Sequence, residues 1–303
     1  MARRHVVAVD IGGTETKAAL VAGTSEAVAA QKHARRATPA ELEPLLAVIA
    51  ELVDELRQAS EHEIDAVGVV APGIVDEANG VGVYTTNLPW SQFPFSTVLT
   101  ERLGVPVAFG HDVRAAGLAE CRMGAAKDLR NAVIMPIGTG IAGALLLDGK
   151  IFSGDGYAGE IGHVNVGHGV PCACGQIGCV ETVASSAAIA RRYTARTGIP
   201  VNGAAEVARR VSDGEQDAVA VWHEAVDALA RGILVLATLL GPEAVVLGGG
   251  LALAGDLLVV PLRERLDGLI AFQRRPELRL AALGDEAGFL GAALLAIDML
   301  EAS

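Results

Sequence analysis

The same pattern of strand, glycine turn and strand occurs twice in this sequence, and this repetition constrains the fold more than any other feature. The first copy joins the apolar run His5–Asp10 to a second run, Lys17–Ala22, through a glycine turn. The second copy joins Asn131–Ile137 to Ala142–Leu147 and aligns with the first without gaps. A repeated unit of this kind predicts two related halves that face one cleft, although two unrelated glycine hairpins can also match by chance.

Strand and helix patterns alternate along the rest of the chain, and this alternation predicts an α/β fold class. After Thr38, apolar residues at spacings of three and four run from Leu42 to Leu56 and predict a helix. Further helices are predicted over Asp112–Met123 and Glu286–Leu300, and the stretch Val211–Leu240 is predicted to contain a long helix. Further strands are predicted over Asp65–Val70 and Ala244–Leu247.

The length and composition favour a protein without a membrane partner. A chain of 303 residues is long enough for two domains, each with its own core. The mean hydropathy is positive, but the longest apolar run, Ile233–Leu240, is far shorter than the roughly 20 residues that a membrane span needs. The first residues lead directly into a strand-like run with no signal-peptide core, so we expect a cytoplasmic protein.

The charge balance argues against nucleic acid as a partner. The formal net charge is −12, whereas binding to a nucleic-acid backbone needs a concentrated basic face. Nucleotide binding is still compatible with this charge, because backbone N–H groups and Mg²⁺ can neutralise phosphate locally.

Three cysteines cluster in one short segment, while Cys121 stands alone. Without a secretory signal, the cluster of Cys172, Cys174 and Cys179 favours a metal site over disulfides. The glycines between these cysteines allow the chain to fold sharply enough for the thiolates to converge. Three buried or redox-active thiols are the alternative interpretation.

Zinc is the metal that this cluster predicts, because it prefers four thiolate or imidazole ligands in a tetrahedron. The fourth ligand could be His163 or His168, the two nearest histidines. A closed set of four protein ligands would make the zinc structural and not catalytic.

The first glycine turn is a candidate phosphate site. Its glycines allow backbone N–H groups to approach phosphate oxygens, and its threonine hydroxyls can add further donors. Asp10 at the strand end could hold Mg²⁺ through water. The turn leads into a strand and lacks the order of a Walker loop, so a plain tight turn is the alternative. The candidate residues are Asp10, Gly12, Gly13, Thr14 and Lys17.

Two further glycine segments could complete a nucleotide site. Gly138, Thr139 and Gly140 form the turn of the second copy and are candidates for phosphate binding. Gly249 and Gly250, which follow a predicted strand, offer a backbone surface suited to adenosine. The alternative for this last segment is a tight turn from strand to helix.

Together these segments resemble the ROK family of sugar kinases and sugar-responsive repressors, and the resemblance extends over nearly the whole chain. The most specific motif is the cysteine segment from Cys172 through Glu181. Other matching segments are Asp10–Lys17, Pro72–Gly73, Asn87–Trp90, Asp112–Glu120, Gly138–Gly140, Gly159–His163 and Gly248–Gly250.

The resemblance implies the actin-like fold of hexokinases, with two α/β domains around a central cleft. The expected division is a small N-terminal domain of residues 1–112 plus 286–303 and a large domain of residues 113–285 with the zinc-binding loop. It implies Zn²⁺ as a structural ion, Mg²⁺ with ATP, and a homodimer or homotetramer.

The resemblance also assigns roles to single residues. Asp112 matches the catalytic base of the family, whereas the residue pattern alone favours a helix N-cap there. The matching sugar contacts are Gly73, Asn87, Glu160, His163 and Glu181, and His163 also matches the family's zinc ligand.

One departure from the family pattern concerns the residue before the catalytic base. The family usually has a sugar-binding Asn there, and this chain has His111. Histidine can still donate or accept a hydrogen bond, but it is bulkier and titratable. The identity of the sugar is therefore left open.

The expected function is ATP-dependent phosphorylation of a hexose hydroxyl, with glucose as the first candidate. Mannose, fructose, allose, an N-acetylhexosamine and a polyphosphate donor remain open, as does a non-catalytic sugar-binding protein. A sugar-responsive repressor is disfavoured, because the first hairpin begins almost at Met1 and leaves no space for a DNA-binding module.

Overall fold

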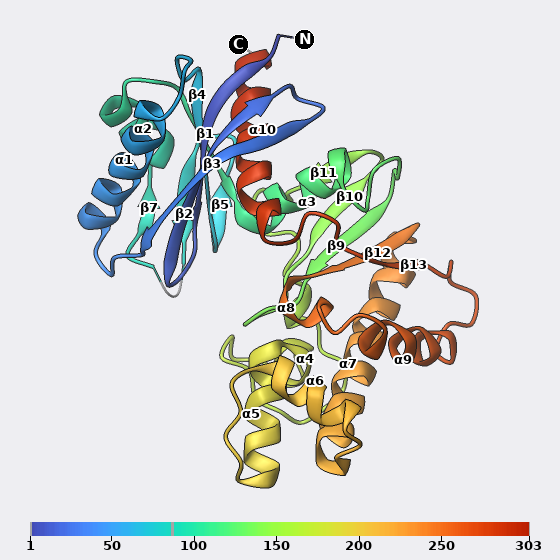
Figure 1. Cartoon of the computed structure of the whole chain (residues 1–303). Helices are drawn as coiled ribbons and strands as arrows, with labels where there is room; N and C mark the ends of the chain where they lie inside the picture. Colours follow the sequence, from blue (N-terminus) through green and yellow to red (C-terminus); the bar gives the residue numbers. More distant parts are fainter. Residues whose placement is uncertain (1, 86–87, 303) are drawn as a thin grey trace. The chain divides into compact units, whose positions relative to one another are not determined.

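The computed structural model describes residues 2–85 and 88–302. The chain divides into two compact units, each built around its own sheet (Figure 1). The first unit comprises Met1–Lys127, Ser153–Ala158 and Asp285–Ser303. The second comprises Asp128–Phe152 and Gly159–Gly284.

The first unit contains a mixed main sheet in the order β3-β2-β1-β4-β8, in which β1, β4 and β8 are parallel. A smaller sheet follows the order β5-β6-β7. The strands are β1 (Arg4–Ile11), β2 (Glu15–Gly23), β3 (Val28–Ala37), β4 (Ala66–Ala71), β5 (Ile74–Asp76), β6 (Val81–Tyr84), β7 (Ser91–Phe93) and β8 (Val107–His111). The helices are α1 (Leu42–Gln58), α2 (Phe95–Leu103), α3 (Asp112–Met123) and α10 (Ala287–Ala302).

Helices cover both faces of this main sheet. On one face, α1 and α2 bury large apolar side chains against alternating strand residues such as Val7 and Val9. On the other face, small residues allow α10 to come close: a Cβ on Gly68 would lie 1.9 Å from the Ala292 carbonyl oxygen. Figure 1 shows α10, at the red end of the chain, lying along the sheet of the first unit.

Helix α3 also packs on α10 within the first unit. A Cβ on Gly291 of α10 would lie 2.0 Å from the Ala115 carbonyl oxygen of α3, so the two helices touch through their backbones. The compact unit therefore continues to Lys127, whereas the expected division ended the small domain at residue 112.

The second unit repeats the strand arrangement of the first. Its sheet follows the order β11-β10-β9-β12-β13, with an antiparallel β9-β10-β11 meander and parallel β9, β12 and β13. This correspondence confirms the internal repetition predicted from the two glycine hairpins. The strands are β9 (Ala132–Pro136), β10 (Ala144–Leu147), β11 (Lys150–Phe152), β12 (Ala244–Gly248) and β13 (Glu277–Leu280).

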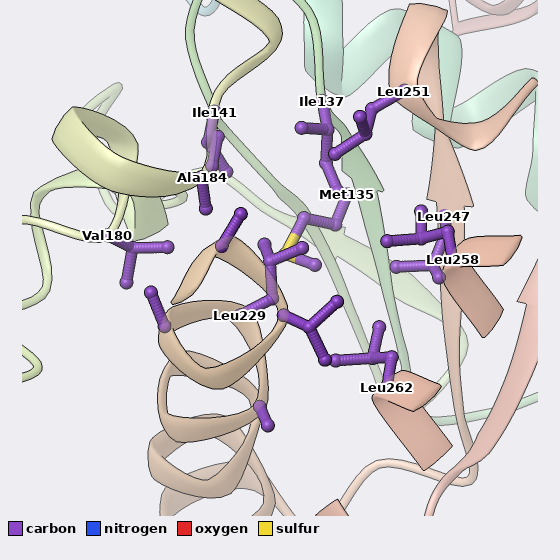
Figure 2. Close-up of a cluster of buried hydrophobic side chains, with 14 of the residues drawn as sticks. Met135, Ile137, Ile141, Val180, Ala184, Leu229, Leu247, Leu251, Leu258 and Leu262 are labelled. Carbon is purple, nitrogen blue, oxygen red and sulfur yellow. The ribbon is translucent and has the colours of Figure 1, made fainter. Parts of the chain in front are cut away.

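The helices of the second unit are α4 (Glu181–Ala184), α5 (Ser186–Thr197), α6 (Ala204–Ser212), α7 (Gln216–Leu240), α8 (Gly249–Ala252) and α9 (Asp256–Asp267). Short 3₁₀ turns lie at Ile161–His163 and at Gly284–Glu286. Figure 2 shows the buried core, where Leu229 of α7 and Leu262 of α9 meet Met135 of β9 and Leu247 of β12.

Most predicted elements are present. The long helix predicted within Val211–Leu240 is α7, which begins at Gln216, and α6 ends before it at Ser212. Gly214 between them has a φ of 79°, which breaks the helical path and which glycine adopts without strain. No helix in the described part of the chain has both the length and the apolar character that crossing a membrane requires.

Candidate active site and metal centre

Three neighbouring parallel strands of the first unit end at predicted site residues. Asp10 lies near the carboxyl end of β1, Gly73 follows β4, and His111 ends β8, directly before Asp112. The register pairs Asp10 with Val70, and the next residue of β4 with His111. Ligands of open α/β sheets bind beyond the carboxyl ends of parallel strands, so this edge has the expected location for a site.

The charge of Asp112 acts on the ionisation of Asp10. Burial and the Asp112 charge together raise the pKa of Asp10 to about 6, against an opposing effect of Lys17. Burial also raises the pKa of Asp112, although its Oδ1 accepts a hydrogen bond from the Val113 N–H at 2.7 Å. A carboxylate with a raised pKa is a stronger general base than an ordinary Asp.

The first glycine turn is fixed from outside by Thr38. The Thr38 hydroxyl donates to the Gly12 carbonyl at 2.8 Å, and the Thr38 N–H donates to the Thr14 carbonyl at 3.0 Å. Gly12 is itself closely approached, because an added Cβ would lie 2.8 Å from the Glu15 carbonyl oxygen. A Cβ on Gly13 would meet no atom within 4 Å, so this backbone is open to a ligand.

The cap of helix α3 is His111 and not Asp112. The Nδ1 of His111 accepts a hydrogen bond from the Arg114 N–H at 3.3 Å. Burial lowers the pKa of His111 to about 4, with a further contribution from the Arg114 charge, so the imidazole is neutral at pH 7. The cap function that the residue pattern alone favoured for Asp112 is therefore performed by its neighbour, and Asp112 is the first residue of α3.

Behind this junction lies an ion pair that the sequence did not reveal. Oε1 of Glu77 accepts hydrogen bonds from the His111 N–H at 3.1 Å and from the Arg114 Nε at 2.9 Å. Arg114 also donates to the carbonyls of Val75 and Gly156. The available signal was an arginine in the first turn of α3, directly before the small and apolar run Ala115–Ala119, which implies a buried partner.

In the second unit, the second and third glycine segments lie against each other. The Ile137 N–H donates to the Gly248 carbonyl at 2.9 Å, and the Leu251 N–H donates to the Ile137 carbonyl at 3.1 Å. Gly249 has a φ of 73°, and a Cβ there would lie 2.6 Å from the Ile137 oxygen. The turn at Gly138–Gly140 and the segment Gly248–Gly250 therefore form one continuous backbone surface.

The predicted metal ligands converge on one point of the second unit. The ligand atoms of the three cysteines and His163 all lie within 4.8 Å of one another. Cys174 Sγ lies 3.7 Å from Cys179 Sγ, and Cys172 Sγ lies 3.6 Å from His163 Nδ1. Zinc–sulfur bonds of about 2.3 Å in a tetrahedron give sulfur separations of about 3.8 Å, so the donor set fits this ion.

His168, the alternative fourth ligand, lies outside the cluster. Its Nε2 is 3.1 Å from the Cys179 carbonyl oxygen, and its Nδ1 accepts from the Val170 N–H. The ring of His168 thus contacts backbone groups of the loop, while Nδ1 of His163 faces the Cys172 Sγ.

The predicted sugar contacts of the second unit lie next to the predicted metal ligands along the chain. The other ring nitrogen of His163 lies 3.9 Å from Glu160 Oε2. Glu181 opens α4, two residues after Cys179, and its Oε2 accepts a hydrogen bond from the Ile141 N–H at 2.8 Å. Asn87, the remaining predicted sugar contact, lies outside the described residues.

Backbone hydrogen bonds join the two chain segments that carry these side chains. The Val180 N–H donates to the Val164 carbonyl at 3.0 Å, and the Val166 N–H donates to the Gly178 carbonyl at 2.9 Å. A metal ion held by His163 and the cysteines would therefore also fix the spacing between the Glu160–His163 segment and Glu181.

Comparison with known proteins agrees with this geometry. The ROK family model matches residues 6–299. The glucokinase of Streptomyces coelicolor is 34% identical over 312 residues, covering 96% of each chain. The N-acetylmannosamine kinase of Salmonella typhi is 31% identical over 298 residues, covering 96% of this chain and 97% of the relative.

A solved structure extends the similarity to the fold. The ROK family glucokinase from Streptomyces griseus, in complex with glucose and AMPPNP, matches with a TM-score of 0.82 at 29% identity, covering 97% of this chain and 99% of that one. Two α/β units with repeated topology define a protein of the actin-like, hexokinase-type fold, as the sequence predicted. The chain belongs to the ROK family.

Proposed function

We propose that this protein is a sugar kinase that transfers the γ-phosphoryl group of ATP to a hydroxyl of a hexose, with glucose as the first candidate. The observation that carries the proposal is Asp112, a carboxylate of raised pKa at the carboxyl end of a parallel strand, at the position of the family's catalytic base. The similarity to a glucokinase over nearly the whole chain supports both the reaction and the first candidate substrate.

In the proposed reaction, Asp112 accepts the proton of the sugar hydroxyl as that oxygen forms a bond to the γ-phosphorus. The bond between the γ-phosphorus and the bridging oxygen of ATP breaks, and ADP leaves. Asp10 would hold Mg²⁺ through water, and the ion would neutralise charge on the phosphates. Positioning and electrostatics account for most of the rate in this type of transfer.

We assign the remaining predicted residues to binding. Sugar hydroxyls both donate and accept, so a mixed set of carboxylate, amide, imidazole and backbone groups suits them. The proposed sugar contacts are Gly73, Asn87, His111, Glu160, His163 and Glu181. The proposed contacts to ATP are Gly12, Gly13, Thr14, Lys17, Gly138, Thr139, Gly140, Gly249 and Gly250.

We propose a structural zinc ion on His163, Cys172, Cys174 and Cys179. Four protein ligands leave no open position on the ion, so it would neither activate water nor polarise the substrate. Its role would be to hold Glu160, His163 and Glu181 in the arrangement that meets the sugar. Thiolate ligands persist in a reducing compartment, which supports a cytoplasmic location.

His111 is the reason to keep other sugars as candidates. It replaces the usual asparagine with a larger ring whose Nδ1 is already used by the helix cap. The similarity to an N-acetylmannosamine kinase adds N-acetylhexosamines to mannose, fructose and allose. Polyphosphate remains an alternative donor, and a sugar-binding protein without catalysis is the second candidate function.

The experiment is a coupled assay of ADP release over a panel of these sugars with ATP and Mg²⁺, and of phosphate transfer from polyphosphate. Sugar-dependent turnover with glucose would support the proposal. Turnover with another hexose would support the kinase assignment but show that glucose is not the substrate. Sugar binding in calorimetry with no transfer from either donor would favour the non-catalytic alternative. Sedimentation would separately test the expected homodimer or homotetramer.

A further inference from the structure

The carboxylate of Glu181 lies at the turn that is assigned to ATP phosphate. Its Oε2 accepts the Ile141 N–H at 2.8 Å, and Ile141 directly follows Gly140. The same oxygen would lie 2.6 Å from a Cβ built on Gly140 and 3.2 Å from one built on Gly162. A larger residue at position 140 would therefore push against this carboxylate.

Helix α5, which follows α4 and its Glu181 in the chain, is tied to the same turn by a second link. The Ser186 N–H at the start of α5 donates to the Gly138 carbonyl at 2.8 Å. Inside the unit, Val180 and Ala184 share one core with Ile137 and Ile141, and Figure 2 shows these side chains beside the helix that carries Leu229. Turn and helix are therefore packed as one rigid body within the second unit.

Within the described part of the chain, Oε2 is the one oxygen of this carboxylate that accepts a hydrogen bond. Among the described residues, the Ile141 amide is the hydrogen-bond donor recorded for the Glu181 side chain. Oε1 is thus available for a sugar hydroxyl while Oε2 remains on the turn. A carboxylate has lone pairs for both partners at once.

We propose that Glu181 couples the sugar site to the ATP phosphate turn, binding the sugar through one carboxylate oxygen and holding the Gly138–Gly140 turn through the other. This inference rests on the proposed function. Occupation of Oε1 by a sugar would fix the side chain and thereby the turn, so that sugar and nucleotide each favour the binding of the other.

The structure supplies a matched pair of glycine variants to test this coupling. A Cβ at Gly140 would meet Glu181, whereas a Cβ at Gly138 would meet no atom within 4 Å. Neither glycine has a positive φ, so alanine brings no backbone strain at either position. Gly140 is assigned to phosphate binding only. Any effect of Gly140→Ala on sugar binding in the absence of nucleotide must therefore pass through Glu181.

Calorimetry with glucose, or with the panel sugar that wild type accepts, would be performed in the absence of nucleotide. Gly140→Ala should weaken sugar binding about tenfold, the size of one hydrogen bond to a charged group, while Gly138→Ala should match wild type. Equal sugar affinities in the two variants would overturn the inference. A wild type that binds no sugar at all would instead reject the proposed function.

A second variant covers the case in which Gly140→Ala does not fold. Glu181→Gln keeps the size of the side chain but weakens its bond to Ile141, so AMPPNP binding without sugar should fall several-fold. The expected loss is one of AMPPNP affinity, and AMPPNP is a ligand that Glu181 does not contact in the proposed function. Unchanged AMPPNP affinity in this variant would contradict the coupling even if sugar binding were lost.

Discussion

Arg114 donates a hydrogen bond from its Nε to Oε1 of Glu77 at 2.9 Å, and this ion pair fixes the backbone from which Asp112 projects. The same oxygen accepts the His111 N–H, so one carboxylate joins the end of β8 to the first turn of α3. Arg114 is only 3% exposed, and a buried charge of this kind depends strongly on its partner.

Replacing Arg114 with methionine should therefore destabilise the protein and slow catalysis. We expect a loss of about 3 kcal/mol in the free energy of unfolding, because Glu77 is left without its partner. The kcat should fall more than the affinity for sugar, since the base is displaced. Urea unfolding and steady-state kinetics would measure both, and Glu77→Gln, which leaves the buried Arg114 charge without its carboxylate, should cost at least as much. An unfolding curve identical to wild type would refute this role.

Replacing Asp10 with asparagine should stabilise the protein and reduce its activity. The raised pKa of Asp10, about 6, means that the ionised form is disfavoured in the folded state. At pH 7.5 the neutral side chain should add about 3 kcal/mol to the free energy of unfolding. The gain should shrink as the pH falls through 6 towards 4, where wild-type Asp10 is protonated as well. Equal stabilisation at pH 7.5 and pH 4 would show that the ionisation of Asp10 is not its cause.

Replacing His111 with asparagine should reduce the acid sensitivity of the fold. The pKa of His111 is lowered to about 4, so the unfolded state binds a proton first as the pH falls below about 6.5. Wild type should lose about 2 to 3 kcal/mol relative to the variant between pH 6.5 and pH 4. Asparagine can still cap α3 but does not titrate, so the variant removes the titration of position 111 and keeps the cap.

Urea unfolding over this pH range would measure the effect of His111→Asn. The matched control is His223→Asn, which makes the same substitution at an exposed histidine of α7. Parallel pH profiles for wild type and His111→Asn would contradict the assigned pKa.

Loss of a cysteine ligand should weaken sugar binding as well as stability. Cys174→Ala removes one member of the cluster, whose constraint extends through Cys179 to Glu181. We expect lower zinc content by mass spectrometry, a lower melting temperature and weaker sugar binding in calorimetry. Cys121→Ala, in α3 and outside the cluster, should retain zinc and sugar affinity. Zinc removal without any change in sugar affinity would break the proposed link.

The sequence predicted the elements whose signals are local. The two glycine hairpins, the bounds of α3 and the convergence of the cysteines all follow from periodicity, turn residues or ligand spacing. The polar edge strand β3 was missed, because five of its ten residues are Gln, Lys, His or Arg and its pairing with β2 is a tertiary contact.

The contacts that join distant residues could not be predicted in this way. The bond from Glu77 to Arg114 and that from Glu181 to Ile141 connect side chains to positions far away in the sequence. Neither pair has a spacing rule, so only the folded chain reveals them. The resemblance to the ROK family marked Glu181 as an expected sugar contact, but did not reveal its bond to Ile141.

Asp112→Asn provides the most direct test of the account. The variant should fold, bind zinc and bind sugar in calorimetry, because the side chain keeps its size and its acceptor oxygen. Its sugar-dependent ADP release should fall at least about a hundredfold, the usual contribution of a general base. Measured beside wild type with the preferred sugar, that outcome would establish Asp112 as the base of a sugar kinase. An unchanged rate of ADP release in a folded variant would contradict the central claim.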